Sequence, residues 1–371
     1  MKIATEPISY GRQWITNEDI QSVVEVLSSD WVTQGPKIEE FERTIASYCG
    51  AKYAVVVSSG TAALHLACLV AGLKKGDGAI TSPNTFVATA NAILYTQAKP
   101  VFSDIDYESL NLDPTDIKRK IGTHTKAILP VHFAGLPADM EAIGSLARQK
   151  GLIVIEDACH ALGSEYRGKK TGSCEYSNMA VFSFHPIKHI TTGEGGCIST
   201  NDRNLYEKLV TLRNHGVYRT EALFQRYGGW YNEMRELGFN YRITDFQCAL
   251  GISQFRRLEQ FLKRREEIAT RYDEAFALLD DRVKLPRLSY DDRRHAWHLY
   301  VLRLRLNASP FGRRQFYELL WERGIKTQVH YQPVYQHPFY RRLFRSKRIS
   351  CPNAERYYDE CRQIFFRKDF F

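Results

Sequence analysis

Lys188 lies in the segment of this sequence whose residue types are best suited to covalent chemistry. Residues 182–196 read Phe-Ser-Phe-His-Pro-Ile-Lys-His-Ile-Thr-Thr-Gly-Glu-Gly-Gly, so the lysine comes five residues after Ser183 and a glycine-rich turn follows it. A lysine acts as a nucleophile only as the neutral amine, which burial and nearby cations favour. The competing interpretation is a surface lysine in a turn, the commoner situation for any single lysine. Two further motifs upstream weigh against it.

The first of these motifs, residues 58–64, joins an apolar strand to a helix and reads Ser-Ser-Gly-Thr-Ala-Ala-Leu. The free backbone N–H groups at the start of a helix favour a phosphate group. Gly60 lets the backbone approach such a ligand closely, and Thr61 adds a hydroxyl donor. An ordinary strand-to-helix turn capped by Ser59 would give the same pattern, and the motif alone does not separate the two.

The second motif, residues 155–161, reads Ile-Glu-Asp-Ala-Cys-His-Ala and places Asp157 just past the C-terminal end of an apolar strand. In open α/β sheets this edge is where ligands bind. A carboxylate at that edge could pair with a protonated ring nitrogen. The alternative is that Asp157 caps a helix, which is the more frequent role of an isolated aspartate at a strand end.

The first two thirds of the chain alternate between short apolar strands and amphipathic helices, and these elements must position the three motifs. Because the strands are continuously apolar and separated by helices, we predict an α/β fold with a mainly parallel sheet covered on both faces. The predicted strands are residues 54–57, 79–81, 100–103, 127–131, 152–155 and 197–200, and the predicted helices are residues 61–72 and 88–95.

The pattern changes near Thr244, where a charged, helix-like stretch begins that runs to about residue 279. A predicted strand at residues 298–304 and a predicted helix at residues 315–322 follow. A chain of this length commonly forms more than one domain. We therefore predict a large domain of residues 1–255 and a smaller C-terminal α/β domain of residues 256–371.

Composition limits the class of protein. The chain has 371 residues, of which 44% are hydrophobic and 25% are charged, as in ordinary soluble globular proteins. No apolar run approaches the roughly 20 residues that cross a bilayer, and the N-terminus lacks the apolar core of a signal peptide. We therefore expect a cytoplasmic protein with no membrane partner. The eight cysteines form no CxxC pair, and we expect no metal site.

The net charge of +9 is distributed unevenly along the chain. Residues 251–371 hold 26 Lys and Arg against 15 Asp and Glu, a balance of +11, whereas residues 1–250 hold 25 against 27, a balance of −2. A solvated basic surface explains this imbalance, and so does a surface that attracts an anionic ligand or nucleic acid. The sequence holds no nucleic-acid-binding motif, so we expect no nucleic-acid partner.

The order of four motifs along the chain resembles a known family. Ser-Gly-Thr-Ala at residues 59–62 is followed by Pro-Asn-Thr-Phe-Val-Ala-Thr at 83–89, Glu-Asp-Ala-Cys-His-Ala at 156–161 and Ser-Phe-His-x-x-Lys-x-Ile-Thr-Thr-Gly-Glu-Gly-Gly at 183–196. This set is similar to the DegT/DnrJ/EryC1/StrS family, over residues 8 to about 361. The resemblance implies a pyridoxal 5′-phosphate (PLP)-dependent transferase of fold type I, like aspartate aminotransferase, that aminates nucleotide sugars.

Three further stretches, together with Tyr10, resemble the pseudaminic acid branch of this family. They are residues 30–35 (Asp-Trp-Val-Thr-Gln-Gly), 240–244 (Asn-Tyr-Arg-Ile-Thr) and 328–335 (Gln-Val-His-Tyr-Gln-Pro-Val-Tyr). The aminotransferase of that branch acts on a UDP-linked 4-keto-6-deoxy-N-acetyl sugar. The resemblance therefore implies this sugar nucleotide and an amino donor, glutamate, as the substrates of a ping-pong reaction.

Matched residue by residue, the family motifs imply roles around the cofactor ring. Lys188 is expected to carry the cofactor as a Schiff base and to move protons between the substrate carbon and the cofactor. Asp157 is expected to pair with the pyridine nitrogen, so that the ring remains an electron sink. Phe86 is expected to stack on the ring, and His160 to lie beside it.

The resemblance also assigns residues to the phosphate and to the substrate. Gly60, Thr61 and Ser183 are expected to hold the phosphate of the cofactor. Asn240 is expected to reach the phosphate of the neighbouring subunit, because active sites in this family form at the interface of a homodimer. The expected sugar and nucleotide residues are Tyr10, Asp30, Trp31, Val32, Thr33, His330, Tyr331, Gln332 and Pro333.

Three alternatives to this function are open at the level of the sequence. The first is amination of another UDP- or dTDP-linked 4-keto sugar, since loops such as residues 330–333 set specificity by small differences. The second is a sugar dehydratase of the same fold, which Lys188 argues against because those proteins typically carry histidine there. The third is a catalytically idle PLP-fold protein used for binding or regulation.

The last ten residues depart from the family pattern. Members usually continue after the stretch at residues 352–358 with a short strand and a final helix, whereas residues 362–371 read Arg-Gln-Ile-Phe-Phe-Arg-Lys-Asp-Phe-Phe. We expect a small domain that is apparently truncated, lacks packing partners and exposes apolar surface that favours aggregation. All residues expected in the chemistry lie upstream of this tail.

Overall fold

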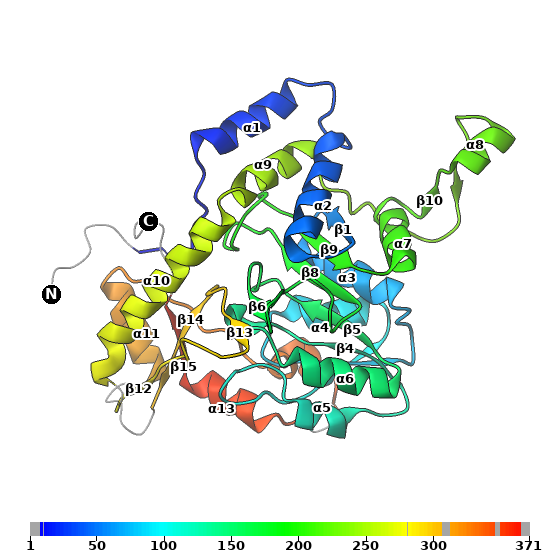
Figure 1. The fold of residues 1–371 in the computed structure, drawn as a ribbon. Coiled ribbons are helices and arrows are strands. Elements are labelled where there is room, and N and C mark those ends of the chain that lie inside the picture. The colour runs from blue at the N-terminus through cyan, green and yellow to red at the C-terminus, as the bar shows by residue number, and fades with distance from the viewer. Residues whose placement is uncertain (1–7, 10, 280, 306–311, 346–348, 365–371) are drawn as a thin grey trace.

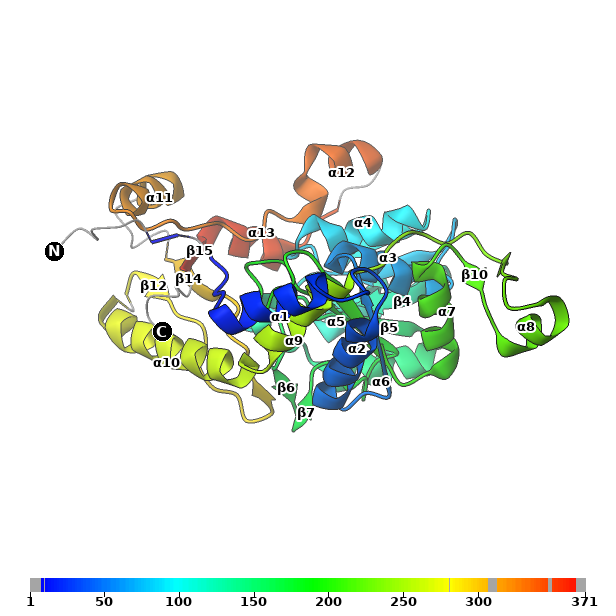
Figure 2. The ribbon, with the colours of Figure 1, turned by 90° about the horizontal axis from the view of Figure 1, so that it is seen from above.

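A seven-stranded sheet lies at the centre of the molecule, with helices on both of its faces (Figures 1 and 2). The structure, a computed structural model, describes residues 8–9, 11–279, 281–305, 312–345 and 349–364. In spatial order the strands are β1 (Tyr53–Val57), β9 (Gly196–Thr200), β8 (Met179–Ser183), β5 (Ile153–Asp157), β4 (Thr125–Leu129), β2 (Gly78–Thr81) and β3 (Lys99–Phe102).

The sheet is mainly parallel, as the sequence predicted. Strands β3, β2, β4, β5 and β8 pair in parallel, and only β9 runs antiparallel, between β8 and β1. Strand β9 follows β8 without a helix between them, and so it returns beside β8 in the opposite direction. The loop that makes this return carries Lys188.

Two apolar cores cover the opposite faces of the sheet, because successive strand residues point to opposite sides. In β1, Val55 and Val57 belong to one core, whereas Ala54 and Val56 belong to the other. The helices over the first face are α3 (Gly60–Val70), α4 (Val87–Tyr95) and α7 (Arg203–Arg213). Those over the second face are α2 (Pro36–Cys49), α9 (Asp245–Phe255), α5 (Pro114–Lys120) and α6 (Met140–Lys150).

The stretch predicted as one long helix from Thr244 is broken into two helices, α9 and α10 (Leu258–Phe276). A contact with the N-terminal part of the chain lies at the break. Arg257 leaves the helical conformation and donates to the buried carboxylate of Asp19 at 2.5 Å, and Gln254 donates to the same carboxylate at 2.7 Å. Because Asp19 belongs to α1 (Asn17–Leu27), these contacts tie the N-terminal helix to the break.

The smaller C-terminal part contains the predicted strand and helix, as β14 (Tyr300–Leu304) and α11 (Arg313–Glu322). Strand β14 lies between β12 (Val283–Lys284) and β15 (Cys361–Ile364), antiparallel to both. This part is therefore a three-stranded sheet flanked by α10 and α11 (Figure 1).

Strand β15 corrects the expectation for the C-terminal tail. The sequence predicted that the tail from residue 362 would leave the small domain short of packing partners, yet residues 362–364 continue β15 and pair with β14. Gln363 lies opposite Val301 in this ladder, so backbone hydrogen bonding recruits the tail although its side chains differ from the family pattern. The phenylalanines from residue 365 onward lie outside the described residues.

The last helices of the chain pack against the part of the molecule that holds the central sheet. They are α12 (Pro338–Leu343) and α13 (Pro352–Glu360), and they share an apolar core with Phe102 and Phe133. Tyr340 donates its hydroxyl to the side chain of Asn91 at 2.6 Å, which fixes α12 on α4. This returning segment forms one wall of the site described below.

The remaining elements are short, and one group of them stands apart. Helix α8 and the hairpin β10–β11 project away from the body of the molecule (Figures 1 and 2). No helix within the described residues combines the length and apolar character needed to cross a bilayer. The short elements are β6 (Glu165–Tyr166), β7 (Lys169–Lys170), β10 (Val217–Tyr218), α8 (Glu221–Tyr227), β11 (Glu233–Met234), β13 (Arg293–Arg294), η1 (Phe133–Gly135), η2 (Ala277–Leu279) and η3 (Val334–Gln336).

Candidate active site

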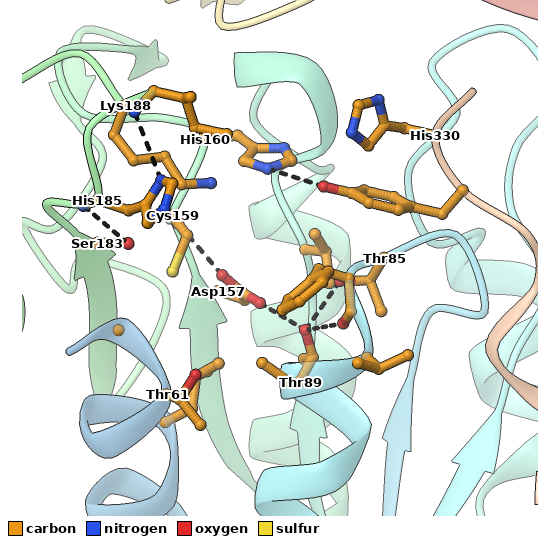
Figure 3. A pocket seen from close by; sticks show the side chains of 18 of the residues that line it. Thr61, Thr85, Thr89, Asp157, Cys159, His160, Ser183, His185, Lys188 and His330 are labelled. Carbon is orange, nitrogen blue, oxygen red and sulfur yellow. Dashed lines mark hydrogen bonds between the residues drawn. The ribbon is translucent and has the colours of Figure 1, made fainter. Parts of the chain in front are cut away.

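A pocket of about 890 Å³ opens at the C-terminal ends of the parallel strands. Such ends are the usual ligand edge of an open α/β sheet. Loops that follow β1, β2, β5 and β8 build one side, and the segment at residues 329–332 builds the other (Figure 3). The predicted site residues that line this pocket are Gly60, Thr61, Phe86, Asp157, His160, Ser183, Lys188, His330, Tyr331 and Gln332.

Lys188 reaches into the pocket from the loop between β8 and β9. Its backbone N–H donates to the carbonyl of His185 at 2.9 Å, which closes a tight turn. Shielding from water lowers the pKa of Lys188, and the nearby Cys159 and Asp157 oppose this lowering. Within the described residues, no carboxylate lies close enough to form an ion pair with its ammonium. A lowered pKa raises the share of the neutral amine, the form in which a lysine is nucleophilic.

Asp157 ends β5, and both of its carboxylate oxygens accept hydrogen bonds. The Thr89 hydroxyl donates to Oδ2 at 2.6 Å, and the backbone N–H of Cys159 donates to Oδ1 at 3.2 Å (Figure 3). The Thr85 hydroxyl lies 2.8 Å from the Thr89 hydroxyl, so the series of hydrogen bonds continues from Asp157 to Thr85. These contacts fix the orientation of the Asp157 carboxylate at the pocket. Turns and not a helix follow Asp157, so the helix-cap alternative is wrong.

A buried pair on the opposite side of β5 holds this strand end in place. Because strand residues alternate, Glu156 points away from the pocket, where its carboxylate lies 2.7 Å from Nε2 of His132. The N–H of Ala138 donates to Nδ1 of the same ring at 3.1 Å, so the ring proton must sit on Nε2 and be donated to Glu156. The Ser177 hydroxyl donates to the other oxygen of Glu156. The contacts of Glu156 therefore help to fix the position of the neighbouring Asp157.

The start of α3 and the end of β8 meet closely at the base of the pocket. The Ser59 hydroxyl accepts the N–H of Ala62 at 3.1 Å, so this residue caps the helix as the alternative interpretation held. Gly60 is needed as well, because a Cβ atom there would lie 2.8 Å from Cβ of Ser183. With Thr61 beside them, these residues present hydroxyls and free helix N–H groups to one space, a combination that suits a phosphate.

Aromatic rings and imidazoles form the opposite wall. The Tyr331 hydroxyl lies 3.4 Å from Nε2 of His160, and the Tyr331 ring lies 6.3 Å from that of Phe86. Burial lowers the pKa of His160 well below its usual value, and the nearby Lys188 and His330 lower it further. His160 is therefore neutral at physiological pH and can contact a ligand without adding charge.

Helix α13 supports this wall from outside the pocket. The Tyr357 hydroxyl donates to the carbonyl of His330 at 2.7 Å. The Tyr335 hydroxyl donates to Glu355 at 2.6 Å, so both ends of the segment at residues 330–335 are anchored on α13. The next residue of α13, Tyr358, lines the pocket itself.

Several predicted site residues lie outside this pocket in one chain. Residues 30–33 are exposed between α1 and α2, and the side chain of the following Gln34 donates to the carbonyl of Ile243 at 2.8 Å. Asn240 is also exposed and bridges to Asn214. Pro333 is buried behind the pocket wall, and Tyr10 lies outside the described residues.

The pocket also contains residues that sequence reasoning did not assign to the site. Thr85 and Thr89 belong to a motif that was recognised, and their hydroxyls could have been proposed as partners of an acid at the same sheet edge. His337 and Tyr358 carry no such signal, because packing of distant segments brings them to the pocket. The unassigned lining residues are Ser59, Leu64, Thr85, Val87, Ala88, Thr89, Val131, Cys159, His185, Ile187, Glu194, Val329, His337 and Tyr358.

Comparison with known proteins assigns this arrangement to a family. Residues 13–370 match the DegT/DnrJ/EryC1/StrS aminotransferase family. The chain belongs to this family. It is 42% identical to the spore coat polysaccharide biosynthesis protein SpsC of Bacillus subtilis, over 95% of this chain and 90% of that protein. It is 38% identical to the UDP-4-amino-4,6-dideoxy-N-acetyl-beta-L-altrosamine transaminase of Campylobacter jejuni, again over 95% and 90%.

A solved structure of an aminotransferase has the same fold. Helicobacter pylori PseC, described as an aminotransferase involved in the biosynthesis of pseudoaminic acid, matches with a TM-score of 0.88 and 33% identity, over 97% of this chain and 93% of that one. The chain is thus a PLP-dependent sugar aminotransferase of fold type I, as the resemblance implied, and not a dehydratase.

The residues of the pocket fit PLP. The buried, hydrogen-bonded carboxylate of Asp157 suits the ring nitrogen. Lys188, with its lowered pKa, suits the aldehyde. The start of α3, which has no side chain at Gly60, suits the phosphate. The cofactor, when bound, supplies an electron sink for a carbanion. The family assignment and the chemistry of these donors therefore agree.

Replacing Gly60 with alanine is expected to weaken PLP binding by roughly tenfold or more. It should also lower the free energy of unfolding by about 1–3 kcal/mol, which is typical for overpacking. The added methyl group would force the start of α3 away from Ser183, where the phosphate donors converge. Titration of the apoprotein with PLP measures the effect. Gly122→Ala is the control, because nothing lies within 4 Å of its added Cβ. Equal PLP affinity in both variants would contradict a phosphate site at this turn.

Proposed function

We propose that this enzyme transfers an amino group from glutamate to C4 of a UDP-linked 4-keto-6-deoxy-N-acetyl sugar, in pseudaminic acid biosynthesis in the cytoplasm. The observation that carries the proposal is that His330, Tyr331 and Gln332 line the same pocket as Lys188. His330 lies across this pocket from Lys188 (Figure 3). These three residues belong to the stretch that resembles the pseudaminic acid branch. The identity to the Campylobacter jejuni transaminase and the likeness to Helicobacter pylori PseC support it.

A second sugar is a real competitor, because the identity to Bacillus subtilis SpsC, at 42%, exceeds the 38% to the altrosamine transaminase. Amination of another UDP- or dTDP-linked 4-keto sugar is therefore the alternative proposal. An idle PLP-fold protein is disfavoured, since Lys188 and Asp157 both face the pocket and carry the hydrogen bonds and lowered pKa that catalysis needs.

In the proposed reaction each residue of the pocket has a defined task. Lys188 would act as the base that removes the proton from the donor carbon bearing the amino group, and then as the acid that delivers this proton to the cofactor carbon that receives the nitrogen. In the sugar half-reaction it would move a proton the other way, from that cofactor carbon to C4 of the sugar. Asp157, which accepts hydrogen bonds from Thr89 and the Cys159 N–H, would pair with the ring nitrogen. Gly60, Thr61 and Ser183 anchor the phosphate, and a fixed cofactor position is a large part of the rate.

The homodimer is also part of the proposal. Asn240 is exposed and stands outside the pocket of its own chain, as expected for a residue that serves the neighbouring subunit. On α1, Ile20, Val24 and Leu27 are 54%, 44% and 56% exposed and share one face of the helix. An exposed apolar stripe of this kind is typical of a surface that a second subunit covers.

The test of the proposed substrate follows the absorption spectrum of the purified enzyme. Glutamate should convert bound PLP to its amino form, and the UDP-linked 4-keto-6-deoxy-N-acetyl sugar should restore the original spectrum. A dTDP-linked 4-keto-6-deoxy sugar serves as the matched competitor, compared through kcat/KM. If glutamate changes the spectrum and the dTDP sugar restores it faster, the alternative substrate class holds. If glutamate changes nothing, glutamate is not the donor.

The basic C-terminal part predicts a salt-dependent affinity for the sugar nucleotide. Residues 251–371 carry a net charge of +11, which attracts a diphosphate over the range of the Debye length. Between about 0.1 M and about 1 M ionic strength this length falls from about 10 Å to about 3 Å. The KM of the sugar nucleotide is therefore expected to rise severalfold while kcat changes little. A KM independent of salt would remove electrostatic attraction from the account.

A further inference from the structure

Three buried imidazoles form a row that begins at the pocket and leads into the protein. His160 lines the pocket, the ring of His298 lies 4.3 Å from it, and the ring of His189 lies 5.6 Å beyond. Their exposed fractions are only 6%, 2% and 4%. His298 and His189 are not among the residues that line the pocket.

His298 is held rigidly at the junction of the two predicted domains. Arg265 of α10 donates to its carbonyl at 3.4 Å, and the N–H of Ala296 donates to the carbonyl of Gly135 at 2.9 Å. A Cβ atom at Gly135 would lie 2.8 Å from the carbonyl of His160 and 3.0 Å from the nitrogen of His298. The absence of a side chain at Gly135 therefore lets the two histidine backbones approach each other.

The row carries no charge at physiological pH. Nε2 of His189 lies 2.9 Å from the carbonyl of Ala296, so that nitrogen must carry the ring proton. Burial lowers the pKa of all three imidazoles, and the charged groups that act on them, Lys188 and Arg265, are cations that lower it further. The row thus differs from His132, whose ring is paired with the carboxylate of Glu156.

We propose that His298 is a positioning residue for transamination: it packs behind the His160 ring and holds that ring against the bound cofactor. Packing is the means, because His298 reaches His160 through ring contact. His298 precedes β14 of the C-terminal part, and His160 follows β5 of the central sheet, so seating of the C-terminal part sets one wall of the cofactor pocket. The inference rests on the proposed place of His160 beside PLP and is independent of the sugar.

The test replaces His298 by leucine, which keeps an apolar volume in the buried space but removes the flat ring behind His160. We expect an altered visible circular dichroism of bound PLP and a severalfold weaker PLP affinity. The kcat with the amino donor should fall roughly tenfold to a hundredfold, as for a misplaced catalytic group, with the KM for the donor unchanged. His298→Asn is the second variant, and either folded variant decides the question.

The matched control is His295→Leu. His295 lies in the same segment, stacks on Trp297 with ring centroids 4.0 Å apart and accepts the Trp297 N–H at 2.8 Å, so its loss costs comparable stability. This control should keep the wild-type dichroism and PLP affinity. Wild-type dichroism and affinity in a folded His298 variant would overturn the proposal. So would additive effects when His298→Leu is combined with His160→Asn, because His298 is inferred to act through His160.

Discussion

Replacing Lys188 with alanine is expected to lower kcat by at least roughly a thousandfold, within the range set by loss of a general acid–base group. The expected cause is twofold. The variant lacks the only amine that the described pocket wall offers for covalent attachment of PLP, and it lacks the base with a lowered pKa. Stopped-flow spectra with glutamate should show no conversion of the cofactor, although PLP still binds through the phosphate site.

Two further lysine variants make this result specific. Lys188→Arg keeps a cation in the pocket but cannot be deprotonated, so it should be as inactive as alanine. Lys169→Ala removes an exposed lysine from β7 and should retain wild-type kcat. Substantial activity in the Lys188→Arg variant would show that a positive charge, and not a neutral amine, is what the reaction requires there.

Replacing Asp157 with asparagine is expected to lower kcat by about 10²–10³-fold, the usual loss when one electrostatic partner of a transition state is removed. Asparagine has nearly the same shape and can still accept the hydrogen bond of Thr89, so positioning is largely preserved. It cannot stabilise a positive ring nitrogen. The loss should therefore appear in kcat of the glutamate half-reaction, while PLP affinity falls less.

The position and the charge of Asp157 can be separated experimentally. Thr89→Val keeps the carboxylate of Asp157 but removes the hydroxyl that donates to it at 2.6 Å, and we expect a smaller loss of kcat than in Asp157→Asn. Asp291→Asn changes an exposed carboxylate and should leave the rate unchanged. If Asp157→Asn retains half of the wild-type kcat, the pyridine nitrogen does not need a charged partner in this enzyme.

The meeting of Lys188, Asp157 and Gly60 could be predicted from the sequence because one geometric rule governs all three. Each lies just after an apolar strand, and the carboxyl ends of parallel strands gather at the same edge of a sheet. Hydrophobic patterning placed six of these strands to within two residues at either end, because continuously buried strands are strongly patterned. The family motifs added the roles, which patterning alone does not provide.

The other wall of the pocket could not be derived in this way. His337 and Tyr358 reach it because α12 and α13 pack back onto Phe102 and Phe133, a contact between segments more than 200 residues apart. Local patterning does not report which distant surfaces meet. The break between α9 and α10 was missed for the same reason, since a buried carboxylate of α1 draws Arg257 out of the helix.

The tail shows a different limit of sequence comparison. Its departure from the family pattern predicted lost packing, yet β15 forms because strand pairing uses backbone groups that every residue except proline carries. Side-chain similarity therefore underestimated how much of the small sheet persists. The asymmetry is physical: pairing tolerates changes of side chain that a packed core does not.

The anchoring of residues 330–335 on α13 has a consequence for how such enzymes diverge. Because Tyr357 holds the carbonyl of His330 and Glu355 holds Tyr335, mutations in a helix largely behind the pocket can reshape the surface that meets the sugar. Adaptation to a new sugar can thus involve coupled changes in residues 330–335 and in α13. A chimera that receives only residues 330–335 from a relative lacks the matching contacts from α13. A chimera that receives residues 329–360 keeps the loop and its supporting helix together.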